Sequence, residues 1–103
     1  MVPFKHLAVN DAKKLIESCT DISIVDIRST DAFMSGHINK AINVSNQNIE
    51  EFIANTNKDK PLICYCYHGY SSQRAASFFI EKGFKEVYSL DGGYTEWENT
   101  YGA

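Results

Sequence analysis

Short apolar runs alternate with amphipathic segments along nearly the whole chain, and this alternation limits the folds that it can adopt. Runs of strand length, rich in β-branched residues, occupy residues 22–25, 41–44, 61–66 and 87–90. Helical periodicity or a helix-ending glycine marks the segments between them, which are residues 10–16, 30–34, 46–54, 72–82 and a last helix through Trp97. Asn10 is the expected N-cap of the first helix. Strands separated by such helices predict an α/β fold with a mainly parallel sheet flanked by helices on both faces.

The size and charge of the chain exclude several classes of partner. Its 103 residues give room for one compact domain, which we expect to span residues 1–103. The net charge is −3 and the longest basic run is Lys13-Lys14, so we expect no nucleic acid partner. No apolar run is long enough to span a bilayer, and we expect no membrane association. Because no heptad pattern or interface stripe is visible, a monomer is expected.

The three cysteines differ in their sequence settings. An odd number of cysteines without a secretory leader does not indicate a disulfide framework, so we expect a cytoplasmic protein with reduced thiols. Cys64 lies within an apolar run and is expected to be an inert part of the core. Cys19, at the end of a helical segment, is expected to be structural or superficial. Cys66 stands at the carboxyl end of the apolar run, immediately before a polar loop that contains a glycine.

This loop has the features of a site that activates a nucleophile. In parallel α/β sheets, ligands bind beyond the carboxyl ends of the strands, where Cys66 is expected to lie. Ser71 and Ser72 are candidate N-caps, so the amino end of the following helix should point toward the thiol. Gly69 allows a tight turn with positive φ, in which backbone N–H groups face inward as an anion-binding nest. These dipoles predict a lowered pKa for the Cys66 thiol.

Other residues near the loop have more than one interpretation. His68 is a candidate general base or a surface residue, and Tyr67 and Tyr70 either form the rim of a pocket or cover apolar surface. The spacing from Cys64 through Cys66 to His68 suggests zinc, but a fourth ligand at a recognisable spacing is missing. We therefore expect no metal and no other cofactor.

Four segments of the chain are to be read together. They are Val25-Asp26-Ile27-Arg28, Gly36-His37-Ile38 with Ala41-Ile42-Asn43, the loop Cys66-Tyr67-His68-Gly69-Tyr70-Ser71-Ser72, and Leu90-Asp91-Gly92-Gly93-Tyr94 with Trp97. In this order they resemble the rhodanese superfamily, especially its single-domain thiosulfate sulfurtransferases of the GlpE type, and the loop is similar to the active-site loop of that family.

The resemblance implies both a fold and a reaction. It implies a five-stranded parallel sheet, with catalytic Cys66 at the base of a pocket and substrate-binding residues Tyr67, His68, Gly69, Tyr70 and Ser71 around it. The thiolate would take the sulfane sulfur of thiosulfate as a persulfide and pass it to cyanide or to a thiol acceptor such as thioredoxin. Many family members carry a cation in this loop, whereas the first basic residue here is Arg74, which predicts a weaker affinity for thiosulfate.

Two other functions compete with sulfur transfer. A cysteine phosphatase or arsenate reductase needs a longer loop closed by an arginine, and Ser72 stands where that arginine would be. A non-catalytic rhodanese-like binding or regulatory module typically lacks the cysteine, which this chain retains. For Asp26, Arg28 and His37 we favour structural roles, in which the acid and the base pair and hold loops together.

Overall fold

The sheet is parallel throughout, as the alternation of strands and helices predicts. The computed structural model describes residues 3–102, and within them the strand order is β1-β5-β4-β2-β3. The strands are β1 (Lys5–Leu7), β2 (Ser23–Asp26), β3 (Ile42–Asn43), β4 (Leu62–Tyr65) and β5 (Val87–Leu90). All neighbouring strands pair in parallel, and Cys64 is in register with Val25 on one side and Ser89 on the other. The strand that leads to Cys66 is therefore the middle strand of the sheet.

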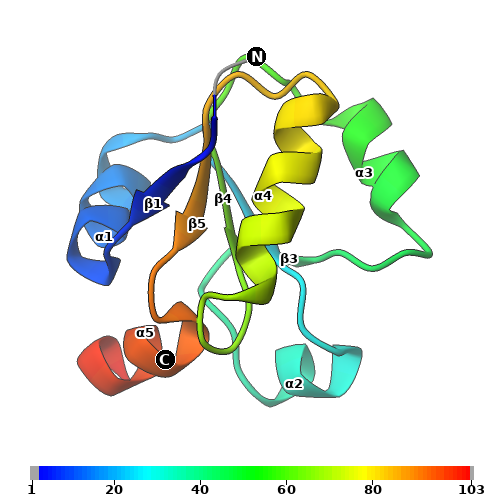
Figure 1. Cartoon of the computed structure of the whole chain (residues 1–103). Coiled ribbons are helices and arrows are strands. Elements are labelled where there is room, and N and C mark those ends of the chain that lie inside the picture. The colour runs from blue at the N-terminus through cyan, green and yellow to red at the C-terminus, as the bar shows by residue number, and fades with distance from the viewer. Residues whose placement is uncertain (1–2, 103) are drawn as a thin grey trace.

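Helices cover both faces of the sheet. Over the same described residues they are α1 (Val9–Ser18), α2 (Thr30–Ser35), α3 (Ile49–Asn55), α4 (Ser71–Glu81) and α5 (Gly93–Tyr101). Figure 1 shows α1 and α5 on one side, α3 and α4 on the other, and α2 near the end of the sheet where the strands finish. Between residues 3 and 102, no helix is long and apolar enough to cross a membrane.

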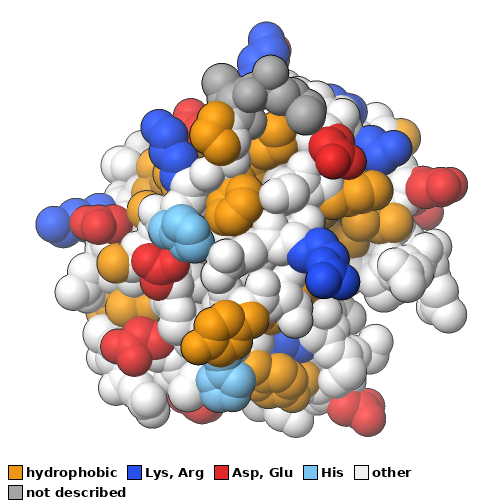
Figure 2. Space-filling view, viewed as in Figure 1, with side chains coloured by type: hydrophobic (Ala, Val, Ile, Leu, Met, Phe, Trp, Pro, Cys, Tyr) orange, Lys and Arg blue, Asp and Glu red, His pale blue; other side chains and the backbone are white. Residues whose placement is uncertain are grey.

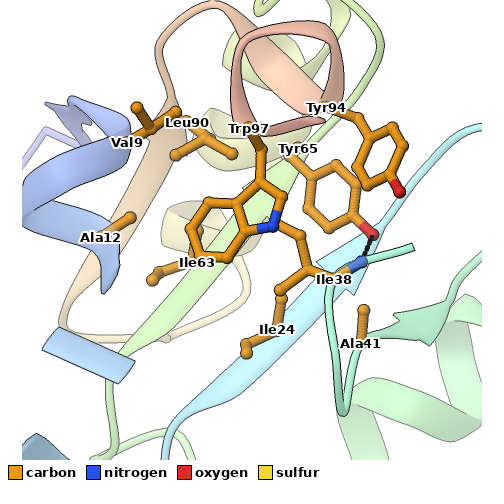
Figure 3. Close-up of a cluster of buried hydrophobic side chains, with 10 residues drawn as sticks. All are labelled: Val9, Ala12, Ile24, Ile38, Ala41, Ile63, Tyr65, Leu90, Tyr94 and Trp97. Carbon is orange, nitrogen blue, oxygen red and sulfur yellow. Dashed lines mark hydrogen bonds between the residues drawn. The ribbon is translucent and has the colours of Figure 1, made fainter. Parts of the chain in front are cut away.

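Alternate side chains of β4 enter two hydrophobic clusters, one on each face of the sheet. Ile63 and Tyr65 belong to the cluster that also contains residues of α1 and α5 (Figure 3). Leu62 and Cys64 belong to the second cluster, with residues of α4. The amide of Ile38 donates a hydrogen bond of 3.1 Å to the hydroxyl of Tyr65, which fixes the segment after α2 against the sheet. The apolar run 61–66 thus has the two-sided burial expected of a central parallel strand.

The amino-terminal part of the fold differs from the prediction in two respects. Strand β1 does not appear among the predicted strands, since it has only three residues, two of them exposed, and pairs with β5 alone. Asn10 is not an N-cap: α1 begins at Val9 with Ala8 as its cap, and Asn10 lies in the first turn. The side chain of Asn10 instead accepts a hydrogen bond of 2.7 Å from the hydroxyl of Tyr101, which joins α1 to α5.

Two other predicted helix starts are also displaced. Helix α4 begins at Ser71 with Tyr70 as its N-cap and no side-chain cap, so the prediction that Ser71 or Ser72 caps this helix is wrong. Both serines lie inside the first turn. Helix α3 begins at Ile49 rather than at residue 46, because Asn48 Oδ1 accepts a hydrogen bond from the amide of Ser45 and closes a turn there.

Candidate active site

Cys66 occupies the first position after β4, at the carboxyl edge of the sheet. Its residue is 7% exposed, so the sulfur lies below the surface rather than on it. The chain then turns through residues 67–70 and enters α4 at Ser71. The strand, the turn and the helix together bring the amino end of α4 to the cysteine, as the sequence predicts.

Two backbone amides point at the sulfur of Cys66. The N–H groups of Gly69 and Ser72 each donate to Sγ at 3.3 Å. Gly69 has φ +92°, the left-handed conformation that the sequence analysis predicts for it. A Cβ atom at Gly69 would lie 2.9 Å from the amide nitrogen of Gly92, so the packing also requires glycine here. The predicted anion nest is therefore present around Sγ.

A buried pair of hydroxyl groups extends this hydrogen-bond network. Ser72 Oγ lies 3.5 Å from Cys66 Sγ and 2.8 Å from Ser89 Oγ, and both serine residues are fully buried. When the sulfur is a thiolate, the Ser72 hydroxyl can donate to it and accept from Ser89. The sequence analysis does not predict that the side chain of Ser72 or of Ser89 contacts Cys66 or its network. Only the β4–β5 register brings Ser89 next to the start of α4.

The surroundings of the two neighbouring thiols shift their pKa values in opposite directions. Burial alone would raise the pKa of Cys66, but the hydroxyl and amide of Ser72 and the amides of Gly69 and His68 together lower it below its ordinary value. For Cys64, burial dominates and raises the pKa strongly, so this thiol stays protonated. Cys64 Sγ donates instead to the carbonyl oxygen of Ser72 at 3.3 Å. Of these two thiols, only Cys66 therefore has the properties of a nucleophile.

The segment after β5 is hydrogen-bonded to the backbone at the start of the active-site loop. The amide of Tyr94 donates to the carbonyl oxygen of Cys66 at 2.8 Å, and the amide of Thr95 donates to that of Tyr67 at 3.0 Å. Gly93, with φ +60°, packs so closely that a Cβ atom would lie 2.5 Å from the carbonyl oxygens of both Cys66 and Tyr67. The amino end of α5 thus holds the loop, a role that the sequence analysis does not assign to it.

The other predicted site residues of the loop, apart from Gly69, are exposed. Tyr67 is 49% exposed and Tyr70 80% exposed, and His68 and Ser71 are also exposed. In Figure 2, hydrophobic side chains and a histidine stand together on the lower part of the face, near the position of the loop before α4 in Figure 1. The side chain of His68 makes no hydrogen bond with any residue between 3 and 102, so no hydrogen bond orients it as a base toward Cys66; its ring lies beside that of Tyr67, with 6.2 Å between the centroids.

Asp26 and Arg28 form a buried ion pair next to this region. The guanidinium donates to the carboxylate of Asp26 at 2.6 Å and to the carbonyl oxygen of Gly36 at 2.6 Å, and the two side chains are 0% and 3% exposed. This geometry confirms that the two residues pair and connect loops. His37 Nδ1 lies 2.8 Å from the carbonyl oxygen of Phe33, and the two rings stack at 3.8 Å, which agrees with a structural role.

Cys64, Cys66 and His68 are not arranged as ligands of a metal ion. Across the described part of the chain, no three His, Cys, Asp or Glu residues are close enough together to hold a metal ion. The neighbouring Cys64 thiol is turned to backbone carbonyls, those of Ser72 and Tyr88.

A parallel α/β sheet that presents one amide-stabilised cysteine at its carboxyl edge defines a class of proteins that react through a cysteine nucleophile. Within that class, the chain belongs to the rhodanese family: residues 8–100 match the family model of the rhodanese-like domain. It is 47% identical to the thiosulfate sulfurtransferase GlpE of Shewanella oneidensis, over 94% of this chain and 95% of that protein. The GlpE protein of Pseudoalteromonas translucida is 44% identical, over 95% and 92% of the two chains.

Solved structures agree with this assignment. A rhodanese-related protein from Thermoplasma volcanium superposes with a TM-score of 0.79 at 22% identity, covering 95% of this chain and 94% of that one. A Rhodopseudomonas palustris protein of unknown function, described as a possible tyrosine phosphatase, superposes with a TM-score of 0.81 at 27% identity, over 94% and 81% of the chains. The predicted fold class and the predicted family are therefore both confirmed.

Proposed function

We propose that the chain is a thiosulfate sulfurtransferase in which Cys66 carries the transferred sulfur as a persulfide. The observation that carries this proposal is the stabilisation of Cys66 Sγ by the amides of Gly69 and Ser72 and by the Ser72 hydroxyl. These contacts lower the pKa of Cys66 and so increase the fraction of the nucleophilic thiolate. The GlpE relatives, which are named as thiosulfate sulfurtransferases, point to the same donor.

In the first half-reaction the Cys66 thiolate attacks the outer sulfur of thiosulfate. A bond forms between Sγ and that sulfur, the sulfur–sulfur bond of thiosulfate breaks, and its electron pair leaves with sulfite. The negative charge then lies on the outer sulfur of the persulfide. Tyr67, His68, Tyr70 and Ser71 surround the donor at the rim, and the amide of Gly69 supports the anion.

In the second half-reaction a nucleophilic acceptor takes the outer sulfur. Cyanide attacks it and leaves as thiocyanate, and the bonding electrons return to Sγ as a thiolate. A thiol acceptor, for example a small dithiol protein such as thioredoxin, would take the sulfur as its own persulfide. This is a ping-pong reaction that uses no cofactor. We propose that the enzyme acts in the cytoplasm as a monomeric single domain.

A phosphatase function receives less support from the geometry. A phosphoryl group in the transition state needs a cation that contacts its equatorial oxygens. At the position where a longer loop would supply arginine, the chain has Ser72, which is fully buried and points toward Cys66 and Ser89. The chain therefore offers hydroxyl and amide dipoles where a phosphatase needs a guanidinium.

The proposal is tested by the mass of the intact protein after treatment with thiosulfate and again after cyanide. We expect a gain of one sulfur atom that cyanide removes. The Cys66→Ser variant should show no gain, whereas the control Cys64→Ser should behave like the wild type, because Cys64 is protonated and buried. If neither thiosulfate nor a small-molecule persulfide adds sulfur to the wild type, the chain is a binding module rather than an enzyme.

A further inference from the structure

A hollow of about 520 Å³ lies on the face of the sheet that α1 and α5 cover. Its walls come from the carboxyl-terminal halves of α1 and α5, from residues 19–24 and from residues 38–40. Among the described residues that line it, none belongs to the active-site loop, and α4 lies on the opposite face (Figure 1). The hollow is therefore separate from the site at Cys66, and a volume of this size suits a small organic molecule.

The inner surface of the hollow is apolar and partly aromatic. Ile24 and Ile38 lie at its base, each 2% exposed, and Figure 3 shows the ring of Trp97 next to them. Ile16 and Tyr101 line the hollow nearer the surface. The rings of Trp97 and Tyr101 meet edge to face, with 4.8 Å between their centroids and 61° between their planes. Such walls favour a flat, aromatic ligand.

The charged side chains of the hollow leave one positive charge without a partner. Lys13 Nζ lies 3.9 Å from a carboxylate oxygen of Glu17 and 4.5 Å from the centroid of the Tyr101 ring. The side chain of Lys40 is exposed and makes no hydrogen bond or ion pair with another residue between 3 and 102. The carboxyl ends of α1 and α5 add partial negative charge, so the hollow suits a ligand with one negative charge beside Lys40 better than a phosphate.

The backbone of Lys40 has a conformation that lysine rarely adopts. Its φ is +72°, and it is the single residue other than glycine with positive φ in the described chain, 3–102. The amide of Ala41 donates to the carbonyl oxygen of Ile38 at 2.9 Å and closes a turn around Asn39 and Lys40, where glycine or asparagine is favoured. Strained residues of this kind cluster at ligand sites, and here the strained residue carries the unpaired charge of the hollow.

We propose that this hollow is a second ligand site of the protein, which binds a small aromatic carboxylate. The aromatic body packs against Trp97, Tyr101 and the isoleucines, and the carboxylate faces the ammonium group of Lys40. This inference goes beyond sulfur transfer at Cys66 and does not depend on it.

The role of the charge is tested by titrating 2-naphthoate into the full chain and measuring Kd from NMR amide shifts. We expect saturable shifts at Ile22, Ile38 and Tyr101. The Lys40→Gln variant should raise Kd about fivefold, whereas Lys14→Gln should leave it unchanged, because Lys14 is exposed on α1 and does not line the hollow. The neutral analogue 2-naphthalenemethanol should bind the wild type about fivefold more weakly than 2-naphthoate.

A glycine variant separates the lost charge from a distorted turn. Lys40→Gly relieves the left-handed backbone, and it should still bind 2-naphthoate as weakly as Lys40→Gln does. An equal loss of affinity in Lys40→Gln and Lys14→Gln would indicate diffuse electrostatic attraction and overturn the proposal. The absence of saturable shifts at the residues of the hollow would overturn it as well.

The position of the ligand is tested by filling the hollow. Cys19→Phe places a ring in the wall, whereas the control Ser18→Phe adds the same ring at the neighbouring exposed position, which does not line the hollow. Excluding roughly a fifth of the naphthalene surface should raise Kd about tenfold in Cys19→Phe alone. Should Cys19→Phe fail to fold, the alkylation of Cys19 in the wild type is measured, and saturating 2-naphthoate should slow it; an unchanged rate would overturn the proposal.

The same titration distinguishes the hollow from the active site. Cys66→Ser should bind 2-naphthoate with the Kd of the wild type, because Cys66 does not line the hollow. Loss of binding in Cys66→Ser, or shifts confined to the active-site loop, would place the ligand at the cysteine and overturn this inference, while leaving the sulfurtransferase proposal intact.

Discussion

The substitution Ser72→Ala isolates the contribution of one hydroxyl group to the reactivity of Cys66. It removes the Oγ atom that lies 3.5 Å from Sγ but retains the backbone amide of residue 72, which donates to the same sulfur at 3.3 Å. Alanine also favours the helical conformation of the first turn of α4. The variant therefore tests the hydroxyl without removing the anion nest.

The expected shift of the Cys66 inflection follows from the strength of the lost hydrogen bond. A hydrogen bond to a charged group is worth about 1.5–3 kcal/mol, and the long distance here places the Ser72 bond near the lower value. A loss of about 1.4 kcal/mol raises the pKa of the thiol by about one unit. At a pH below the inflection of the pH–rate profile, the fraction of thiolate is then about tenfold lower. Because a more basic thiolate is about threefold more nucleophilic, the rate at a pH well below both inflections should fall only about threefold. The inflection itself should move clearly to higher pH.

A second variant separates this effect from lost stability. Ser72→Ala leaves the buried hydroxyl of Ser89 without its partner, which should cost about 1–3 kcal/mol of unfolding free energy. The double variant Ser72→Ala/Ser89→Ala removes both polar groups and should recover part of that stability. Its pH–rate profile should still resemble that of Ser72→Ala, because the bond to the thiolate is absent in both.

The assay is the rate of alkylation of Cys66 by iodoacetamide as a function of pH, followed by mass. A Cys19→Ser background removes the half-buried thiol of Cys19, and Cys64, which is 0% exposed, should not react. The Cys66→Ser variant provides the blank. An inflection at the same pH in the wild type and in Ser72→Ala would refute the argument, since the amides alone would then account for the lowered pKa.

Three further outcomes are expected. Asp26→Ala leaves Arg28 buried without its counter-ion and should lower the unfolding free energy by about 3–5 kcal/mol, measured by urea denaturation. Gly93→Ala introduces a Cβ atom 2.5 Å from the carbonyl oxygen of Cys66 at φ +60°, and should reduce both turnover and stability, the latter by about 2–4 kcal/mol. Cys64→Ser should lower stability by about 1 kcal/mol and leave thiosulfate turnover within about twofold of the wild type; a large loss of turnover would show that Cys64 takes part in the chemistry.

The sequence predicts well the central part of the fold and the position of Cys66 in it. The run 61–66 is buried on both faces of the sheet, so its unbroken hydrophobicity identifies a central parallel strand and places Cys66 at the carboxyl edge. The positive φ of Gly69 follows from the same local pattern of a strand, a glycine-containing turn and a helix. These features depend on residues close together in the chain, which is why local reasoning finds them.

The parts that escape prediction depend on contacts between distant segments. Strand β1 is mostly exposed, so its residues show no strand-like hydrophobic pattern. It belongs to the sheet only because it pairs with β5. Ser89 belongs to the site because β4 and β5 are in register, and nothing in its own segment indicates a polar role. Gly93 supports the loop because the ends of β4 and β5 lie side by side, and its own segment does not indicate that contact. Such contacts become visible only after the segments have been placed in three dimensions.

The described partners of Cys66 Sγ are all neutral, and this suits a reaction in which the charge moves. The sulfur is contacted by the amides of Gly69 and Ser72 and by a hydroxyl, not by a lysine or arginine. When the persulfide forms, the negative charge moves outward by about 2 Å, the length of a sulfur–sulfur bond. A cation paired with Sγ would oppose that movement, whereas dipoles around the loop can favour both positions. Salt should therefore leave the inflection of Cys66 alkylation nearly unchanged, because buried dipoles are screened little. If the inflection shifts clearly with salt, charged groups contribute to the activation of Cys66 and the argument from neutral dipoles is wrong.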